Sequence, residues 1–438
     1  MNEFRKKIVD LAKVKKGKYI KGWIMKNLDG EEFVVWDGLK KVNIRISRDI
    51  VQKNLEELKE GNFILAELDS DNTIKKEEQL ALLLEDSSGI DIMSMKDEDF
   101  LKYRYLDIRY TKLKNLKMKS KLIQKSVEFF SKEGFDYIET PFLTSSINEY
   151  TMDEFKVYSP LYEGEYYTLS QSPQVYKQLL MTSGVDKYIQ LARSFRAEQG
   201  DDTHLQEFTQ LDSEIACHSK EEIMDLLEKY ICYVFKETAG IELERPFPRY
   251  EYLKIVEEFN TDDPGEVVST DEFFEKKGHQ DNSEFRPCWI TRFPYAVKRG
   301  EKLVTSHHVM SKPEEIEKIY EDNVDLTQLT CQSYDLMLQG VEIGGGDIRI
   351  ENADDQLRLL KLMGYSEETI QEKFSPLLKG LSCATPPHGG FAIGLDRIAM
   401  LLCRDNRINS VTAFPKTPDC RDLLTNGPKK EIKIEEGR

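Results

Sequence analysis

The chain has 438 residues, of which 39% are hydrophobic and 32% are charged, and its net charge at pH 7 is −17. This length predicts a small domain beside a larger one. No apolar run approaches the roughly 18–20 residues that a membrane-spanning helix needs, and the N-terminus lacks the apolar core of a secretory signal. The negative net charge argues against a nucleic-acid partner, but only as an average over the whole chain, because an acidic protein can carry a local basic face.

Residues 1–88 are predicted to form a small β domain. The strand-like segments KYIKGWIM, EEFVVW and KVNIRI precede a helical segment, and FILAEL and QLALLL follow it. Three strands, a helix and two strands fit a five-stranded OB-like barrel. Pattern alone leaves a generic small β domain equally open. The charged stretch 89–111 is interpreted as a linker.

Residues 112–438 have a different pattern. A long segment with helical spacing ends at Gly134, and Ser219 is placed to cap a second long helix. The strand-like segments between and after these helices group together instead of alternating with helices. This grouping predicts an α+β domain built on an antiparallel sheet.

The first polar stretch that could form a functional site is FRAEQGDDTHLQEFTQLDSE, residues 195–214. By the period-two rule, one strand of this stretch turns Arg196 and Glu198 to the same face. The other strand turns a second set to one face: Phe208, Gln210, Asp212 and Glu214. For any one of these residues, a hairpin with a solvated polar face is the simpler interpretation, but the combination of arginine, aromatic ring and acids favours a site.

Two further stretches have the chemistry of a phosphate site. Asp335 and Glu342 lie just before the triple glycine Gly344–Gly346, which lets a ligand approach the backbone. Two carboxylates near phosphate oxygens suit Mg²⁺. Arg397 stands where a glycine-rich strand enters an amphipathic helix, a position that can turn a guanidinium toward phosphates. A plain turn and a structural salt bridge are the alternatives for these two stretches.

Taken together, these stretches resemble the class II aminoacyl-tRNA synthetases, and among them the aspartyl-tRNA synthetases of class IIb. The resemblance covers about residues 103–425. GFDYIETPFL with Pro141 resembles motif 1, FRAE with EFTQLDSE resembles motif 2, and GLDR resembles motif 3. QSPQVYKQLLM resembles the substrate loop of the aspartate branch, and AFPKTPDCRDLL resembles its C-terminal tail. The large insertion domain of the bacterial aspartate enzymes is absent between motifs 2 and 3.

The resemblance implies an antiparallel catalytic sheet flanked by helices and an ATP site. Arg196 would hold the α-phosphate, Arg397 would bind the γ-phosphate, and Phe208 would stack on adenine. Mg²⁺ would bind Asp335 and Glu342. The other residues implied at the ATP site are Glu198, His204, Leu205 and Gly394.

The resemblance also implies an amino-acid pocket. Lys177 and Arg349 would read the side-chain carboxylate of aspartate, and Glu149 would bind the substrate ammonium. The other residues implied there are Ser172, Gln174, Gln210, Asp212, His307 and His308. A buried Lys–Arg pair would face an amide with uncompensated positive charge, so the pattern favours aspartate over asparagine.

The implied function is ATP-dependent formation of aspartyl-adenylate and transfer of the aspartyl group to tRNA. The N-terminal barrel would read tRNA through a stacking Phe33, worth roughly 1–3 kcal/mol, together with Lys26 and Asn43. Motif 1 implies a homodimer. The seven scattered cysteines include no C-x-x-C pair and predict a reducing, cytoplasmic compartment.

Four departures from the family pattern keep other functions open. Besides the missing insertion domain and the weak match of the barrel, Tyr150 and Thr151 replace small residues of the substrate loop, and Asp201 and Asp202 place negative charge in a loop that usually contacts tRNA. The alternatives are a paralogue that passes the adenylate to ammonia, a small metabolite or a protein, and an asparagine-specific or non-catalytic paralogue.

Overall fold

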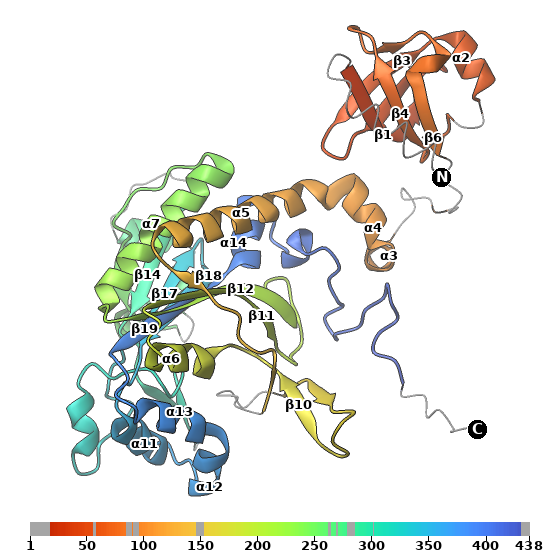
Figure 1. Ribbon diagram of the computed structural model, residues 1–438. Coiled ribbons are helices and arrows are strands. Elements are labelled where there is room, and N and C mark those ends of the chain that lie inside the picture. The colour runs from red at the N-terminus through yellow and green to blue at the C-terminus, as the bar shows by residue number, and fades with distance from the viewer. Residues whose placement is uncertain are drawn as a thin grey trace, which may run out of the picture. The chain divides into compact units, whose positions relative to one another are not determined.

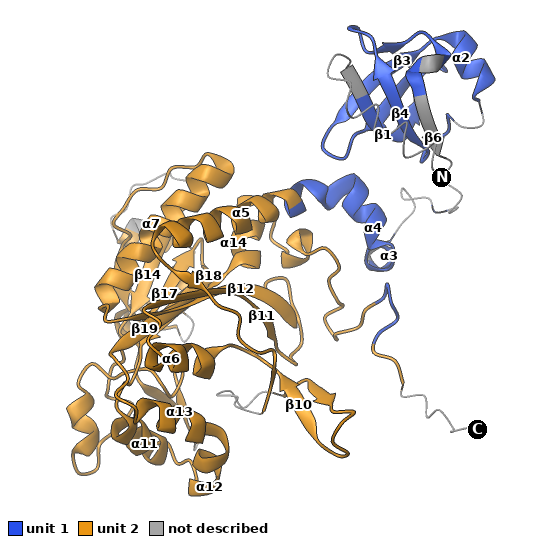
Figure 2. Cartoon of the chain, in the orientation of Figure 1, with its two compact units in different colours: residues 1–116, 423–427 blue, residues 117–422, 428–438 orange. Residues whose placement is uncertain are grey.

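The computed structural model describes residues 18–55, 58–84, 90, 96–145, 153–261, 264–268, 270–277, 285–300 and 302–430 (Figure 1). The chain divides into two compact units (Figure 2). Unit 1 holds residues 1–116 and 423–427, and unit 2 holds residues 117–422 and 428–438. None of the helices in the described ranges is long and apolar enough to cross a membrane.

Unit 1 contains one curved sheet with strand order β5-β3-β2-β1-β4-β6. Its strands are β1 (Lys18–Asn27), β2 (Glu32–Trp36), β3 (Lys41–Ile46), β4 (Phe63–Leu68), β5 (Thr73–Ile74) and β6 (Leu80–Leu84), with α2 (Arg48–Lys53) and η1 (Glu77–Gln79) between them. The long strand β1 pairs with both β2 and β4. Burial alternates along β2 and β4, so every second side chain enters one apolar core.

The prediction that Phe33 stacks on a base is wrong. Phe33 is 0% exposed and packs in the barrel core with Val35 and Ile44. It falls on the inward register of β2, where its ring has no open face. Lys26 and Asn43 are exposed and pair in register with the same residue of β2, Val34, so both lie on the outer face of the barrel.

Helical turns occupy the second half of the stretch that was interpreted as a linker. They are α3 (Asp97–Lys102), α4 (Arg104–Asp107) and the π-helix η3 (Ile108–Lys112). The Arg109 guanidinium lies 4.5 Å from the centre of the Trp23 ring, and Trp36 Nε1–H donates to the Arg109 carbonyl. These helical turns therefore cover aromatic side chains on the outside of the barrel.

The core of unit 2 is an eight-stranded sheet with the order β13-β14-β17-β18-β19-β12-β11-β7. Its strands are β7 (Asp136–Tyr137), β11 (Lys187–Phe195), β12 (Glu207–Ala216), β13 (Arg249–Glu251), β14 (Pro287–Thr291), β17 (Ser333–Leu338), β18 (Val341–Ile348) and β19 (His388–Gly394). The strands from β14 to β11 are antiparallel, and only the two edge strands β13 and β7 pair in parallel. The predicted α+β class with an antiparallel sheet is confirmed.

Three helices pack on the sheet in one apolar core: α5 (Leu113–Lys132), α7 (Lys220–Ala239) and α14 (Leu395–Leu402). Phe130 of α5 lies 4.9 Å from the Tyr230 ring of α7 and 5.6 Å from the Phe391 ring of β19. Both predicted helix ends are confirmed. Gly134 follows α5 with φ +82°, and Ser219 caps α7 through the backbone N–H of Glu222.

Unit 2 has further helices and strands around this core. The helices are α6 (Gln174–Thr182), α8 (Tyr252–Phe259), α9 (Pro264–Val267), α10 (Asp271–Lys276), η4 (Ile316–Tyr320), α11 (Ala353–Leu362), α12 (Glu367–Thr369), η5 (Ile370–Phe374), α13 (Ser375–Leu381) and η6 (Ile408–Val411). The strands are β8 (Leu143–Thr144), β9 (Lys156–Tyr158), β10 (Tyr166–Leu169), β15 (Ala296–Arg299) and β16 (Lys302–Thr305). Strands β8, β10 and β9 form a small sheet of their own.

Candidate active site

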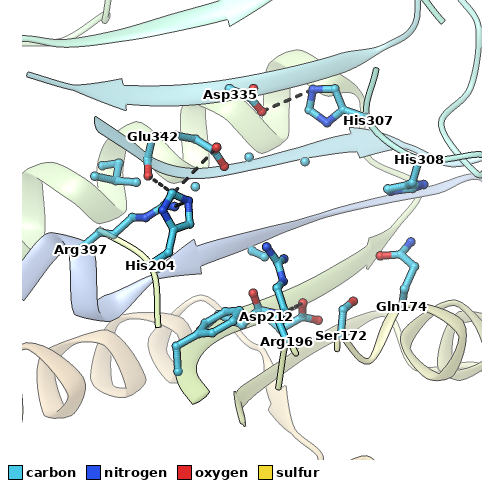
Figure 3. Close-up of a pocket in the computed structure, with 18 of the residues that line it drawn as sticks. Ser172, Gln174, Arg196, His204, Asp212, His307, His308, Asp335, Glu342 and Arg397 are labelled. Atoms are coloured by element: carbon cyan, nitrogen blue, oxygen red, sulfur yellow. Dashed lines mark hydrogen bonds and ion pairs between the residues drawn. The ribbon is translucent and has the colours of Figure 1, made fainter. Parts of the chain in front are cut away.

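One cavity gathers the polar stretches singled out in the sequence (Figure 3). Its walls come from β12, β17, β18, β19, the first turn of α6 and the loop between β11 and β12. The predicted site residues of the catalytic unit that line it are Ser172, Gln174, Lys177, Arg196, Glu198, His204, Leu205, Phe208, Gln210, Asp212, His307, His308, Asp335, Glu342, Arg349, Gly394 and Arg397. Glu149 lies outside the described residues.

Arg196 and Phe208 face each other in the wall of the cavity. The Arg196 guanidinium lies 5.2 Å from the centre of the Phe208 ring. The expectation that Arg196 and Glu198 lie on a strand is wrong, because β11 ends at Phe195. Both residues begin the loop that follows, where the Arg196 N–H donates to the Gln206 carbonyl at 2.8 Å.

Arg397 is held from two sides at the first turn of α14. Its Nη1 donates to the Glu342 carbonyl at 2.7 Å, and its Nη2 lies 2.9 Å from His204 Nε2. The neighbouring Asp396 is the anchor of this turn. It pairs with Lys119 of α5 and accepts from the Thr209 backbone N–H of β12 at 3.1 Å. Helix α5 and the segments that resemble motifs 2 and 3 thus meet beside the cavity.

Asp335 and Glu342 bring two carboxylates to the cavity from paired strands, β17 and β18. Burial, Glu342 and Asp347 together raise the pKa of Asp335 well above its usual range. Gly345 lies opposite, and a Cβ there would stand 2.3 Å from Asp335 Oδ1. Burial also lowers the pKa of His307 to about 4, so the ring that lies 3.4 Å from Asp335 is neutral at pH 7.

These two carboxylates fit a cation only with help from a ligand. Across the described ranges, no group of three or more His, Cys, Asp or Glu side chains is arranged to hold a metal ion. Mg²⁺ is commonly bound by one or two carboxylates together with phosphate oxygens and water. Burial and then Glu342 raise the pKa of Asp335, and a nearby divalent cation would stabilise its ionised form.

The cavity is also lined by two buried cations, Lys177 and Arg349, each paired with a protein carboxylate. Lys177 Nζ lies 3.3 Å from Asp212 Oδ1 and 3.4 Å from Glu214 Oε2. Arg349 Nε and Nη2 donate to the two oxygens of Glu214 at 2.9 and 3.2 Å. Lys177 and Arg349 are each 2% exposed, so both charges depend on these partners.

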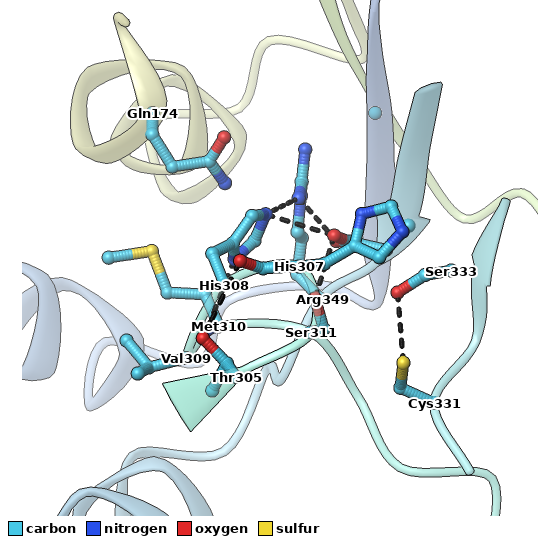
Figure 4. A network of polar contacts seen from close by, with 12 residues as sticks. Gln174, Thr305, His307, His308, Val309, Met310, Ser311, Cys331, Ser333 and Arg349 are labelled. Atoms are coloured by element: carbon cyan, nitrogen blue, oxygen red, sulfur yellow. Dashed lines mark hydrogen bonds and ion pairs between the residues drawn. The ribbon is translucent and has the colours of Figure 1, made fainter. Parts of the chain in front are cut away.

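Asp347 is a third carboxylate in this pocket, and its place there was not predicted from the sequence. It accepts from Arg349 Nη1 and from Ser311 Oγ, the latter at 2.8 Å. The Met310 N–H donates to His308 Nδ1, and His308 Nε2 lies 2.9 Å from Asp347 Oδ2 and 2.5 Å from Arg349 Nη1 (Figure 4). The available signal was the period-two spacing of Asp347 and Arg349 in GGGDIRI.

The pocket therefore has two cations against three carboxylates. Burial raises the pKa of Asp212 to about 6 against the pull of Lys177, and Glu214 adds to the rise. Burial alone would raise the pKa of Glu214, but Arg349 and Lys177 more than offset it and the pKa is lowered. Asp347 likewise has a lowered pKa, because Arg349 and His308 outweigh its burial. The expected uncompensated Lys–Arg pair is not present, since protein carboxylates already balance it.

The antiparallel sheet, and a cavity that gathers two arginines and a pair of carboxylates, are the features of a class II aminoacyl-tRNA synthetase. A family model described as tRNA synthetases class II (D, K and N) matches residues 96–418, and the chain belongs to this family. It is an ATP-using aminoacyl-tRNA ligase with an α+β catalytic fold and an N-terminal OB-like barrel.

Named relatives cover most of the chain. The aspartate–tRNA(Asp/Asn) ligase of Acaryochloris marina is 32% identical over 466 residues, which covers 78% of this chain and 77% of that protein. The ligase of the same name from Aquifex aeolicus is 32% identical over 461 residues and covers 76% of each.

A solved structure shares the fold. The asparaginyl-tRNA synthetase of Pyrococcus horikoshii, complexed with asparaginyl-adenylate, aligns with a TM-score of 0.71 at 22% identity and covers 92% of this chain and 95% of that chain. At that identity, the likeness shows the fold alone.

Proposed function

We propose that this protein activates L-aspartate with ATP and transfers the aspartyl group to tRNA. A carboxylate oxygen of aspartate attacks the α-phosphorus, pyrophosphate leaves, and aspartyl-adenylate forms. A ribose hydroxyl at the tRNA 3′ end then attacks the acyl carbon, and AMP leaves. The observation that carries this proposal is one cavity lined by four cationic side chains, those of Arg196, Arg397, Lys177 and Arg349.

The first step joins two anions, so the protein must supply positive charge and position. Arg196 would hold the α-phosphate and the reacting carboxylate, with adenine stacked on Phe208. Arg397 would bind the γ-phosphate end. The remaining ATP contacts would come from Glu198, His204, Leu205 and Gly394. No protein nucleophile is needed.

Mg²⁺ would bind Asp335 and Glu342 and supply charge neutralisation for the phosphates. The support is the presence of both carboxylates in one cavity, where burial and then the neighbouring Glu342 raise the pKa of Asp335. His307 borders Asp335 but, as a neutral ring, adds no charge to this pair at pH 7.

The amino-acid pocket would hold aspartate between Lys177 and Arg349, with Gln174 and Asp212 beside the substrate ammonium. Ser172, Gln210 and His308 complete the wall, and Glu149 stays a prediction. Asparagine is the second candidate substrate. The observation that favours it is the excess of pocket carboxylates over cations, since a neutral amide adds no further negative charge to Asp212, Glu214 and Asp347.

The outer face of the barrel would contact tRNA through Lys26 and Asn43. The protein would act as a homodimer, because apolar side chains at β7 and β8 are open to a second copy. Tyr137 is 46%, Phe142 43% and Leu143 48% exposed. None of the seven cysteines, all of which lie in the described ranges, forms a disulfide, and this fits the reducing cytoplasm.

Pyrophosphate exchange with ATP tests the substrate. Labelled pyrophosphate should enter ATP in the presence of aspartate, with asparagine at least about 100-fold weaker in kcat/KM, the discrimination that charged and polar contacts can supply. Exchange driven by asparagine but not by aspartate would overturn the aspartate assignment. Exchange with neither amino acid would overturn the adenylate chemistry as well.

A further inference from the structure

The loop between β11 and β12 holds an acidic residue that the proposed roles leave unused. Asp201 accepts from the backbone N–H groups of Thr203 and His204 at 2.6 and 2.8 Å. Its two oxygens each lie 2.9 Å from His204 Nδ1. Burial would raise the pKa of Asp201, but these hydrogen bonds outweigh it and lower the pKa to about 2.

The loop is anchored by segments that follow far along the chain. The Gly200 N–H donates to the Pro418 carbonyl at 2.9 Å, and the Ile408 N–H donates to the Asp202 carbonyl at 2.7 Å. Gln206 Nε2 also donates to the Pro418 carbonyl, at 2.8 Å. With its backbone held at these points, the loop presents His204 to Arg397 in one orientation (Figure 3).

The donors and acceptors on either side of His204 determine which ring nitrogen carries its proton. Arg397 has only donors, so His204 Nε2 must accept from Arg397 Nη2 at 2.9 Å. The ring proton then sits on Nδ1, where it donates to Asp201, which has only acceptors. A neutral His204 with this tautomer therefore connects Asp201 to Arg397, and the Arg397 Nε–H adds a 3.4 Å contact to the Thr203 carbonyl.

We propose that Asp201 is a positioning residue for ATP binding, acting through the His204 tautomer to hold Arg397 in the cavity. This inference rests on the proposed contact of Arg397 with the triphosphate. In this proposal the acidic loop takes part in nucleotide binding. The sequence alone had indicated only that its negative charge would repel tRNA. Asp202 offers a matched control, because it is exposed and its side chain makes no hydrogen bond or ion pair with the described residues.

The test is the KM for ATP in amino-acid-dependent pyrophosphate exchange. Asp201→Ala should raise the KM for ATP about tenfold, the size of one charge-assisted hydrogen bond, with kcat and the KM for the amino acid nearly unchanged. Asp201→Asn keeps an acceptor for Nδ1–H and should restore most of the affinity. Asp202→Ala should match the unsubstituted protein.

A double-mutant cycle separates action through His204 from support of the loop. In a His204→Ala background, Asp201→Ala should raise the KM for ATP no further. A penalty that persists in that background, or equal KM values for Asp201→Ala and Asp202→Ala, would overturn the inference. Absence of exchange in the unsubstituted protein would instead be a failure of the proposed function, so the two failures are distinguishable.

Discussion

At the scale of single residues, the amino-acid pocket is a balance of buried charges. Lys177 and Arg349 are paired by Asp212, Glu214 and Asp347, and all five side chains are at most 2% exposed. Removing one partner of a buried ion pair leaves an unpaired charge and costs about 3–5 kcal/mol. A substitution in this pocket can therefore weaken the binding of every substrate. The ratio of kcat/KM for two substrates is the readout from which such a general loss cancels.

Asp347→Asn should raise the preference for aspartate over asparagine. It keeps the shape of the side chain and removes one negative charge near the place proposed for the substrate carboxylate. We expect the ratio of kcat/KM for aspartate to that for asparagine to rise about tenfold, because like charges in this buried pocket repel by roughly 1–2 kcal/mol or more. An unchanged or lower ratio in pyrophosphate exchange would contradict this account of the pocket charge.

The activity should depend on the ionisation of Asp212. Its pKa of about 6 means that the carboxyl is mostly protonated at pH 5 and mostly ionised at pH 7. Since the ionised form is the one that attracts the substrate ammonium, kcat/KM for the amino acid should rise across this interval with a midpoint near 6. The same group stabilises the folded state below its ordinary pKa of 3.8, and this contribution is lost as the pH rises through about 6.

Asp212→Asn is the control for that profile. The variant should lose the ascending limb with the midpoint near 6, whatever activity remains. If the limb persists unchanged in Asp212→Asn, another group titrates there and the role of Asp212 is wrong.

At the scale of elements, the triple glycine brings β18 and β19 together beneath the cavity. A Cβ on Gly346 would stand 2.0 Å from the Gly390 carbonyl oxygen, whereas a Cβ on Gly394 would meet its nearest atom at 3.7 Å. Gly346→Ala should therefore lower the free energy of unfolding by about 2–3 kcal/mol, and Gly394→Ala should change it little. Equal denaturation midpoints for the two variants would contradict the packing argument.

Sequence alone could predict those features that depend only on residues close together in the chain. The end of α5 at Gly134 and the cap of α7 at Ser219 follow from neighbouring residues, and both are confirmed. The gathering of motif residues in one cavity was expected only through family resemblance. The Lys119–Asp396 pair and the anchoring of the Gly200 loop by Pro418 join segments more than 200 residues apart, and no local pattern signals them.

Two errors show why the rest escaped prediction. Phe33 has the residue type of a stacking platform, but the register of β2 turns its ring into the core. A one-residue shift of register exchanges the two faces of a strand, so residue type alone does not decide exposure. Asp347 was passed over because the charge of a pocket depends on which side chains from separate strands meet, and Glu214 and Arg349 are 135 residues apart.

At the scale of the whole molecule, we expect the two compact units to have different functions. The cavity is lined entirely by residues of unit 2, and the barrel with its exposed Lys26 and Asn43 belongs to unit 1. Adenylate formation should therefore depend on unit 2, and tRNA selection should depend also on unit 1.

Removing residues 1–88 should spare pyrophosphate exchange and reduce tRNA charging about 100-fold, because phosphate and base contacts worth a few kcal/mol would be lost. Lys26→Glu in the full chain should lower charging in the same direction without the risk of misfolding a truncated protein. Unchanged charging by both proteins would mean that the barrel does not read tRNA.

The central claim is that aspartate reaches tRNA through this cavity, and the most direct test is the transfer of labelled aspartate onto total bacterial tRNA. Purified protein, ATP, Mg²⁺ and labelled aspartate should give acid-precipitable, ribonuclease-sensitive label, with labelled asparagine giving far less. Protein that exchanges pyrophosphate with aspartate yet leaves tRNA unlabelled would contradict the claim and point to another acceptor for the adenylate.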